Sequence, residues 1–312
     1  MKVSIKKAIE MIRSGDVVAI PTETVYGLAA DAQNPLAIAK TFSLKGRPQD
    51  NPLIVHISRT DQLYDFAEFV PEEALKLAEK FWPGPLTLVL RKKPEVLDAV
   101  TAGLQTVALR MPDHPAAIKI IEACGPLTAP SANRSGRPSP TKPEHIVQDY
   151  GEEVAWIDGS ETDIGIESTV LNLTETPFSI LRPGKISAAE ISGVLQQTVS
   201  SESSKKELEK SPGTRYSHYK PNAKVRWIES DENPGENENA LYLIHKKDLR
   251  EYALENIICF HGNYPLFAKT LYDLFRSADL KNYSEIVIER FSDRSLSGIE
   301  IALLNRLSKA VS

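Results

Sequence analysis

The segment from Val17 to Leu28 reads VVAIPTETVYGL, an apolar run followed at once by a polar turn. Its first part, Val17–Ile20, is typical of a strand buried in a core. Thr22 and Thr24 then fall where the strand ends, and a rigid scaffold commonly displays functional groups at such ends. Hydroxyls that merely cap a turn would give the same pattern. The surrounding sequence must therefore decide between the two interpretations.

The alternation of strands and helices continues through residues 1–195. Asn34 and Pro35 supply a cap and a first-turn proline for a helix through Phe42, which places Lys45 just past a helix end. Buried strands are predicted at Leu53–Ile57, Leu86–Leu90, Val107–Leu109 and Leu127–Ala129, a hairpin pair at Ser168–Leu173 and Phe178–Leu181, and further helices at Ala74–Phe81, Pro115–Cys124 and Ser187–Leu195. This order predicts one α/β unit.

Residues 196–223 separate this unit from a second one. Residues 196–210 read QQTVSSESSKKELEK, which has no periodic apolar face and predicts an exposed linker. Residues 211–223, SPGTRYSHYKPNA, hold more aromatics than a plain tether needs. In residues 224–312, strands are predicted at Lys224–Ile228, Leu241–Ile244, Ile257–Phe260 and Ile286–Ile288, and helices at Leu266–Ser277 and Ile299–Lys309. We expect a small Rossmann-like parallel α/β domain there.

The composition argues against several classes of protein. The chain has 312 residues and a formal net charge of -5, so its overall charge does not attract nucleic acid or an anionic membrane. Cys124 and Cys259 stand far apart and form neither a disulfide framework nor a zinc or redox pair. No apolar run has the length of a membrane helix, and the N-terminus lacks the apolar core of a signal peptide. We expect a cytoplasmic protein.

Common nucleotide and hydrolase signatures are absent from the sequence. It contains no GxxxxGK[ST], GxGxxG, HExxH or GxSxG motif. The segment PGKIS at Pro183–Ser187 lacks the first glycine of a phosphate loop. If ATP binds to this chain, its site must be built in another way.

Two cations flank a glycine in SLKGRPQDNPLIVHI, residues 43–57. Lys45 and Arg47 across such a turn can face one polyanion, because Arg forks onto phosphate oxygens while Lys adds a point charge. Asn51 follows the turn, and His56 lies in the next predicted strand. A solvated basic turn and a satisfied core histidine are the alternative interpretations.

Further polar groups occur where later strands end. Arg110 closes the strand in TVALRMPDHP, and a cation buried there needs a carboxylate partner, which a substrate could supply. PLTAPSANRSGRPSPT places Ser131, Asn133 and Ser139 in a turn whose hydroxyls and backbone N–H groups suit an anion. An irregular loop without function is the alternative interpretation of that turn.

Two more clusters complete the set of candidate residues. IESTV brings Ser168 to the start of a strand, and ILRPG brings Arg182 to the end of one. Together the clusters offer cations for phosphates, an arginine for a carboxylate and hydroxyls for orientation. No cysteine, Ser/His/Asp set or acid pair stands out as a nucleophile. This combination indicates catalysis by positioning and charge neutralisation, as in phosphoryl or nucleotidyl transfer.

The order of the motifs resembles a known family. PTETVYGL, the Lys45-x-Arg47 turn, the Ser131-x-Asn133 turn, STV and LRPG follow one another as in the YrdC-like domain family. With SPGTRYSHYKP and the second unit added, the chain resembles the long, two-domain threonylcarbamoyl-adenylate synthases of that family. The resemblance implies a twisted open α/β sheet with a positively lined concave face, a linker and a small C-terminal α/β domain.

The resemblance also implies a reaction. Its inputs are L-threonine, bicarbonate and ATP with Mg²⁺, and its products are threonylcarbamoyl-adenylate and pyrophosphate. The threonine amine takes up carbon dioxide as a carbamate, whose oxygen attacks the α-phosphorus. A separate transferase complex then uses the product to modify the adenosine beside the anticodon of certain tRNAs.

Residue assignments follow from the same resemblance. The threonine positions are Thr24, His56, Arg110, Ala129 and Ser168, with Arg110 as the carboxylate clamp. The nucleotide and phosphate positions are Lys45, Arg47, Asn51, Thr106, Ser131, Asn133, Ser139 and Arg182, of which Lys45, Arg47, Ser131 and Asn133 are expected to act in catalysis. Tyr216, His218 and Tyr219 match a lid motif, with Tyr216 and Tyr219 reaching ATP.

Three other interpretations account for parts of the sequence. A double-stranded RNA-binding module would use Arg134, Arg137 and Lys142 on phosphates, but the net charge of -5 and the lack of stacking aromatics there argue against more than a weak RNA contact. A carbamoyl-transfer enzyme of hydrogenase maturation would carry cysteine clusters that two isolated cysteines cannot form. The second domain has no chemical motif and is compatible with a purely structural role.

Overall fold

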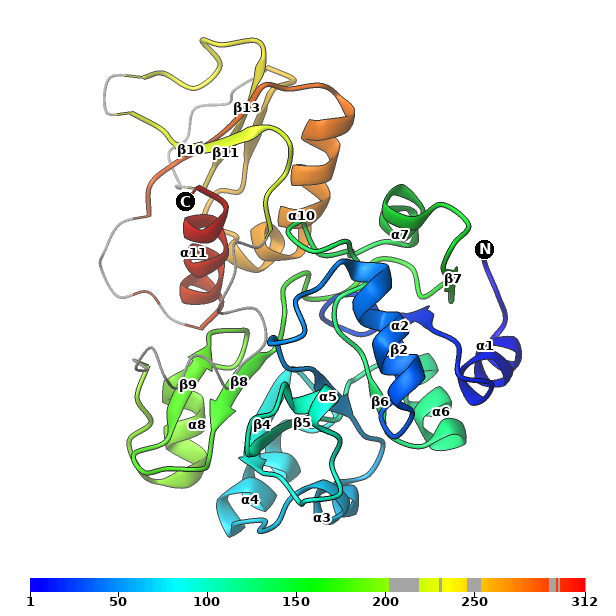
Figure 1. The fold of residues 1–312 in the computed structure, drawn as a ribbon. Coiled ribbons are helices and arrows are strands. Elements are labelled where there is room, and N and C mark those ends of the chain that lie inside the picture. The colour runs from blue at the N-terminus through cyan, green and yellow to red at the C-terminus, as the bar shows by residue number, and fades with distance from the viewer. Residues whose placement is uncertain (202–218, 230–231, 246–253, 292–295, 297, 312) are drawn as a thin grey trace.

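The computed structural model describes residues 1–201, 219–229, 232–245, 254–291, 296 and 298–311. They form two units, each built around its own sheet (Figure 1). The larger sheet has nine strands in the order β7-β1-β2-β6-β3-β5-β4-β8-β9, and the smaller has four in the order β10-β13-β11-β12. Tyr216 and His218 lie outside the described residues.

The first unit has these elements. Its strands are β1 (Val18–Ile20), β2 (Gly27–Asp31), β3 (Ile54–His56), β4 (Leu86–Arg91), β5 (Thr106–Arg110), β6 (Leu127–Thr128), β7 (Ala155–Trp156), β8 (Thr169–Asn172) and β9 (Ser179–Arg182). Its helices are α1 (Ile5–Arg13), α2 (Pro35–Lys45), the 3-10 turn η1 (Thr60–Gln62), α3 (Leu63–Phe66), α4 (Glu72–Phe81), α5 (Asp98–Thr101), α6 (Pro115–Cys124), α7 (Pro143–Tyr150) and α8 (Ala188–Leu195).

The register of the larger sheet gathers the ends of several strands. β3 and β5 run parallel with His56 opposite Arg110, so both side chains leave the sheet at the same edge. β4 and β8 are also parallel, with Leu86 opposite Thr169, and this pairing brings Ser168 near that edge. The expected α/β sheet is therefore present, its strands run both parallel and antiparallel, and its strand ends supply one side of a pocket.

Two expected boundaries in the first unit are wrong. The helix predicted to end near Phe42 continues to Lys45, because Gly46 takes the left-handed conformation (φ 59°) and ends it there. Ser200, which was predicted to lie in an exposed linker, instead pairs with β9, and its N–H donates to Phe178 O at 2.8 Å. Val199 is buried beside it, so its apolar side chain draws this part of the linker into the core.

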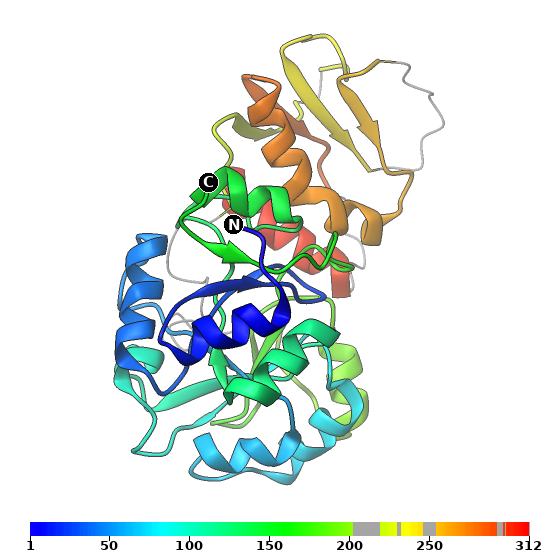
Figure 2. The same ribbon diagram turned by 90° about the vertical axis from the view of Figure 1, so that its right-hand side faces the viewer.

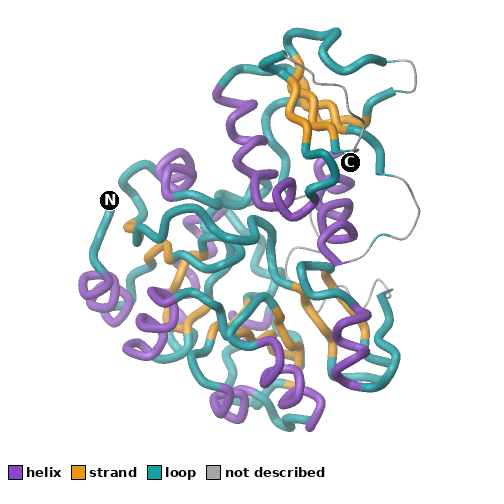
Figure 3. Tube along the Cα trace, turned by 180° about the vertical axis from the view of Figure 1, so that it is seen from behind, coloured by secondary structure: helices purple, strands orange, loops and turns teal. Residues whose placement is uncertain are grey.

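In its described residues the second unit is an all-parallel sheet with two long helices. Its strands are β10 (Lys224–Trp227), β11 (Ala240–Ile244), β12 (Ile257–Cys259) and β13 (Glu285–Ile288), and its helices are α10 (Tyr264–Leu280) and α11 (Gly298–Val311). Every recorded strand pair in it is parallel, as predicted. Figures 2 and 3 show α10 and α11 on the side of this sheet that faces the first unit.

The two units share part of one apolar core. Ile164 and Ile166 of the first unit cluster with Phe267 and Leu271 of α10 and with Leu303 of α11. This shared cluster fixes α10 and α11 against the first unit. Within the described ranges, none of the helices combines the length and the apolar composition needed to cross a lipid bilayer.

Candidate active site

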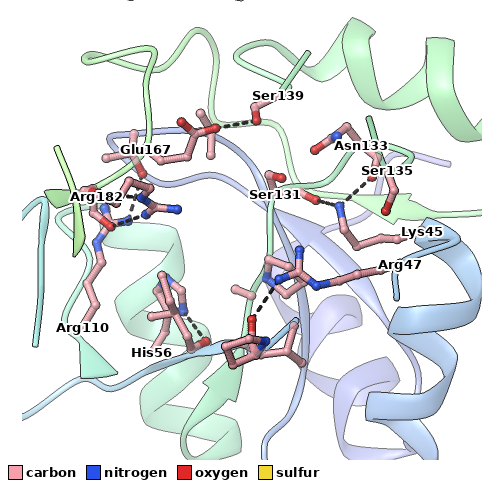
Figure 4. Close-up of a pocket in the computed structure, with 18 of the residues that line it drawn as sticks. Lys45, Arg47, His56, Arg110, Ser131, Asn133, Ser135, Ser139, Glu167 and Arg182 are labelled. Carbon is pink, nitrogen blue, oxygen red and sulfur yellow. Dashed lines mark hydrogen bonds between the residues drawn. The ribbon is translucent and has the colours of Figure 1, made fainter. Parts of the chain in front are cut away.

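A pocket opens at the edge where β3, β5 and β9 end and β8 begins, and the close-up in Figure 4 shows its lining. It brings together residues from turns and strands that lie far apart in the sequence. Of the candidate residues, those that line it are Thr24, Lys45, Arg47, His56, Arg110, Ala129, Ser131, Asn133, Ser139, Ser168, Arg182 and Tyr219.

Thr106 lies elsewhere. It begins β5, whereas Arg110 at the other end of that strand lines the pocket. Thr106 instead lines a separate surface hollow with Arg91 and Glu175. Because the strand runs through the core between the two residues, the predicted contact of Thr106 with ATP in this pocket is not supported.

Asn51 lies beside the pocket without lining it. Its side chain is 0% exposed, and neither amide atom has a hydrogen-bond partner among the described residues. Its backbone carbonyl accepts from Arg47 Nε at 3.2 Å. The structure therefore shows Asn51 holding Arg47 in place.

Arg110 is fixed by groups of the protein. Its Nη2 lies 2.6 Å from Glu23 Oε1, and both side chains are buried. Its Nη1 donates to Thr24 Oγ1 at 3.0 Å and its Nε to Gly84 O at 3.2 Å. From the sequence, a substrate carboxylate is the expected partner of this cation. That expectation is wrong in one respect, because Glu23 from the PTETV turn already balances its charge.

His56 lies next to Arg110 across the β3–β5 pairing. Its Nδ1 is 3.3 Å from Ile54 O. Burial and the neighbouring Arg110 charge lower the pKa of His56 to about 3. The imidazole is therefore neutral near pH 7, and it presents an uncharged ring to the pocket.

Ser168 and Arg182 both line the pocket and are hydrogen-bonded to each other. Arg182 donates from Nη2 to Ser168 Oγ at 3.0 Å and from Nε to Ser168 O at 3.1 Å. Ser168 Oγ is also 2.8 Å from Thr87 Oγ1 on β4. These bonds orient the guanidinium of Arg182, and Figure 4 shows it close to Arg110.

Lys45 ends α2 and points into the Ser131–Asn133 turn. Its Nζ donates to Ser131 O and, at 2.6 Å, to Asn133 O. Burial and the nearby Arg47 charge lower the pKa of Lys45 well below its usual value. Arg47 turns the other way and donates from Nη2 to Pro52 O at 2.8 Å. Two cations thus occupy one wall of the pocket, as the sequence predicted.

The three cations weighed for RNA binding are engaged in ion pairs. Arg134 lies 3.0 Å from Glu153, Arg137 lies 3.2 Å from Asp149, and Lys142 lies 2.7 Å from Asp273. These pairs neutralise the charges that would have to attract phosphates. The structure therefore gives no support to a double-stranded RNA-binding surface at these residues.

Comparison with known proteins identifies the family. Residues 10–184, more than half of the chain, match the Sua5/YciO/YrdC family model, described as "Telomere recombination". The chain belongs to the Sua5/YciO/YrdC family. Residues 186–312 match a second model, described as "Threonylcarbamoyl-AMP synthase, C-terminal domain". This Sua5/YciO/YrdC chain is therefore of the two-domain form.

Relatives extend the match to the full length of this Sua5/YciO/YrdC protein. The threonylcarbamoyl-AMP synthase of Bacillus subtilis is 42% identical, and the alignment covers 98% of this chain and 92% of the relative. That of Pyrococcus abyssi is 41% identical over 98% of this chain and 93% of the relative. A solved structure titled "Crystal structure of P. abyssi Sua5 complexed with L-threonine" superposes with a TM-score of 0.87 at 38% identity, covering 100% of this chain and 96% of that one.

One functional candidate of this Sua5/YciO/YrdC chain was missed in the sequence. Glu167 precedes Ser168 in IESTV, lines the pocket and accepts from Ser139 Oγ at 2.6 Å. Burial raises its pKa, but Arg306 and Arg182 outweigh burial and lower the pKa to about 2. The one sequence feature that could have indicated Glu167 is that an acidic residue stands directly before a predicted apolar strand. Its partner Arg306 lies 139 positions away, and no local pattern connects the two.

Proposed function

We propose that this chain is a threonylcarbamoyl-AMP synthase, which forms threonylcarbamoyl-AMP and pyrophosphate from L-threonine, bicarbonate and ATP. The observation that carries the proposal is the full-length similarity to enzymes of that name, at 42% identity over 98% of the chain. The pocket supports it independently. It gathers Lys45, Arg47, Arg110 and Arg182, and its described lining contains no cysteine and no hydrogen-bonded serine–histidine pair to act as a nucleophile.

L-threonine is proposed to bind at Thr24, His56, Arg110, Ala129 and Ser168. Arg110 is oriented by Glu23 and Thr24, yet both of its terminal nitrogens carry further hydrogens, which can fork onto the threonine carboxylate. Neutral His56 adds no second positive charge there. The amine can then face the centre of the pocket, where its nitrogen adds to carbon dioxide and releases a proton to give a carbamate. The carbon dioxide forms from bicarbonate by loss of hydroxide, so that one water is released overall.

ATP is proposed to bind against Lys45, Arg47, Ser131, Asn133, Ser139 and Arg182, with Tyr219 beside it. A carbamate oxygen attacks the α-phosphorus, and the bond to pyrophosphate breaks. Lys45 and Arg47 stabilise the charge that develops on the phosphate oxygens, which is catalysis by position and electrostatics. Burial lowers the pKa of Lys45, but an arriving triphosphate favours its protonated form again.

Mg²⁺ is proposed to arrive with ATP. Among the described residues that line the pocket, Glu167 is the single carboxylate, and its oxygens already accept from Ser139, Tyr272 and Arg306. No group of three or more His, Cys, Asp or Glu side chains in the described ranges is arranged to hold a metal. Phosphate oxygens and waters would then supply most ligands, as Mg²⁺ prefers. The bound ion would neutralise the triphosphate.

The product is proposed to pass to a separate transferase complex that modifies the adenosine beside the anticodon of certain tRNAs. Threonylcarbamoyl-AMP is a mixed anhydride, so the reaction that consumes it must transfer the threonylcarbamoyl group to an amine. A cytoplasmic location is proposed with it. Both cysteines are free thiols, which suits a reducing compartment.

The test measures pyrophosphate release from ATP and Mg²⁺ with the purified chain. Threonine and bicarbonate are each left out in turn, and bicarbonate is depleted by degassing. We expect release only when both are present, together with one threonylcarbamoyl-AMP per pyrophosphate by mass spectrometry. Release that continues without threonine would refute the proposal.

A further inference from the structure

The smaller unit reaches the wall of the pocket through a buried arginine. α11 carries Arg306, whose side chain is 0% exposed. Its Nε lies 2.8 Å from Oε2 of Glu167, which lines the pocket in the first unit. The pocket wall thus depends on a charge that the nine-stranded unit does not supply.

Glu167 is hydrogen-bonded in turn to Ser139, and Figure 4 shows this bond. Ser139 donates its hydroxyl hydrogen to Glu167 Oε1 at 2.6 Å, a short bond of the charge-assisted kind. A hydroxyl has a single hydrogen, so the oxygen of Ser139 can only accept from a ligand in the pocket. It therefore suits a hydroxyl or amino group of a nucleoside, because a phosphate oxygen has no hydrogen to donate.

Arg306 also supports an aromatic ring that lines the pocket. Its guanidinium carbon lies 5.6 Å from the ring centre of Tyr219, a cation–π distance. Tyr219 in turn stacks on Tyr272 of α10, with the ring centres 5.3 Å apart. The hydroxyl of Tyr272 donates to Glu167 Oε2 at 3.1 Å. Arg306 thus contacts both Glu167 and the ring system beside it.

We propose that Arg306 is a positioning residue for the nucleoside end of the pocket. Through Glu167 it fixes Ser139 as a hydrogen-bond acceptor for the nucleoside, and through its guanidinium it holds the ring of Tyr219. This inference rests on the proposed function, since it takes the bound nucleotide to be ATP. It assigns the smaller unit a part in substrate recognition.

A nearby contact between the units provides a matched control. Asp273 of α10 lies 2.7 Å from Lys142 and 3.0 Å from His145, both on the first unit. None of these three residues lines the pocket. Asp273→Asn therefore weakens the contact between the units without touching the Arg306–Glu167–Ser139 connection.

The experiment measures dissociation constants by calorimetry for a non-hydrolysable ATP analogue with Mg²⁺ and, separately, for L-threonine. The proteins are the full-length chain and the variants Arg306→Met, Arg306→Lys, Ser139→Ala, Arg306→Met with Ser139→Ala, and Asp273→Asn. We expect Arg306→Met to weaken analogue binding by about tenfold, as for a lost hydrogen bond to a charged group. Arg306→Lys should weaken it less, and threonine affinity should stay within about twofold, a change smaller than the loss of one hydrogen bond.

The double variant separates positioning from general damage. If Arg306 acts through Ser139, Arg306→Met should weaken analogue binding markedly less when Ser139 is already alanine, because contacting residues couple. An unchanged affinity in Arg306→Met or an equal loss in Asp273→Asn would overturn the inference, and additive losses would overturn the role of Arg306 in fixing Ser139. Arg306→Lys keeps the buried charge and allows the same comparison with Ser139→Ala if Arg306→Met does not fold.

Failure of the proposed function would look different. The unaltered chain would then bind the analogue without releasing pyrophosphate in a threonine-dependent way, or would not bind it at all. Failure of the present inference alone leaves that turnover intact in the unaltered chain and removes only the difference between the Arg306 variants and Asp273→Asn.

Discussion

On one wall of the pocket Arg110 is held by Glu23, and both belong to the larger unit, whereas Glu167 on the same wall is held by Tyr272 and Arg306 of the smaller unit (Figure 4). We call these two parts of the wall the Arg110 end and the Glu167 end. Each pairs a buried carboxylate with a buried arginine. The first is complete within one unit, while the second requires both. Changes at the contact between the units should therefore reach the Glu167 end and spare the Arg110 end.

The contact between the units should give the largest effect. Arg276 of α10 is 1% exposed and lies 2.8 Å from Asp149 Oδ2, while Asp149 also lies 3.2 Å from Arg137 on the pocket wall. Arg276→Met leaves the Asp149 carboxylate buried without its main partner. We expect the free energy of unfolding to fall by ~3–5 kcal/mol, measured by urea denaturation. Arg276→Lys should lose less, and a loss below ~1 kcal/mol in Arg276→Met would contradict a buried pair that matters.

The Arg110 end should respond in substrate binding. Arg110→Ala removes the proposed carboxylate clamp, and we expect the catalytic efficiency for threonine to fall by an amount equivalent to ~2–3 kcal/mol. The KM for ATP should change less, because Lys45, Arg47 and Asn133, which are proposed to bind ATP, lie across the pocket from Arg110 in Figure 4. The measurement is pyrophosphate release at varied threonine. An unchanged threonine KM would show that Arg110 serves only as the partner of Glu23.

The sequence predicted the elements that depend on local pattern. Pro115–Cys124 is a helix with the predicted bounds, because a first-turn proline and a following glycine mark both ends. β2 was not predicted, since its sequence GLAAD has little strand character, and it forms because β1 and β6 pair with it on both sides. Pairing with strands distant in the sequence therefore makes residues 27–31 a strand, although their intrinsic strand propensity is low.

In the candidate site, too, the residues marked by a local sequence pattern could be predicted, and the contacts between distant residues could not. Lys45, Arg47 and Arg182 could be proposed from their positions at turns and strand ends. Glu23 could not be connected with Arg110, nor Glu167 with Arg306, because these pairs are 87 and 139 positions apart and no periodicity connects them. The Glu167 end was also the harder to foresee, since part of it comes from a unit without any chemical motif.

The two ends should differ in their response to acid. The pKa of His56 is lowered to about 3 from 6.5, so its contribution to stability is present above pH 6.5 and is lost as the pH falls toward 3. The pKa of Glu167 is lowered to about 2 from 4.5, so its contribution is lost only between pH 4.5 and 2. Between pH 6.5 and 4.5, His56→Gln should therefore flatten the pH dependence of unfolding, by up to ~1.4 kcal/mol per pH unit.

Urea denaturation over that range tests the assignment. Glu167→Gln is the matched control, because it should leave the slope between pH 6.5 and 4.5 intact and flatten the curve only at lower pH. Equal slopes in His56→Gln and the unaltered chain would show that His56 does not stay neutral in the folded state.

Loss of an exposed ion pair should change the free energy of unfolding least, and it gives a reference value for the buried ion pairs. Arg134 and Glu153 lie 3.0 Å apart with side chains 49% and 51% exposed, and neither side chain is among those that line the pocket. Water screens such a pair, so Glu153→Gln should change the free energy of unfolding by less than ~1 kcal/mol, and added salt should reduce even that. A loss as large as that of Arg276→Met would mean that burial does not separate the strong contacts from the weak ones. The different behaviour of the Arg110 end and the Glu167 end would then have to follow from the geometry of their contacts and not from their burial.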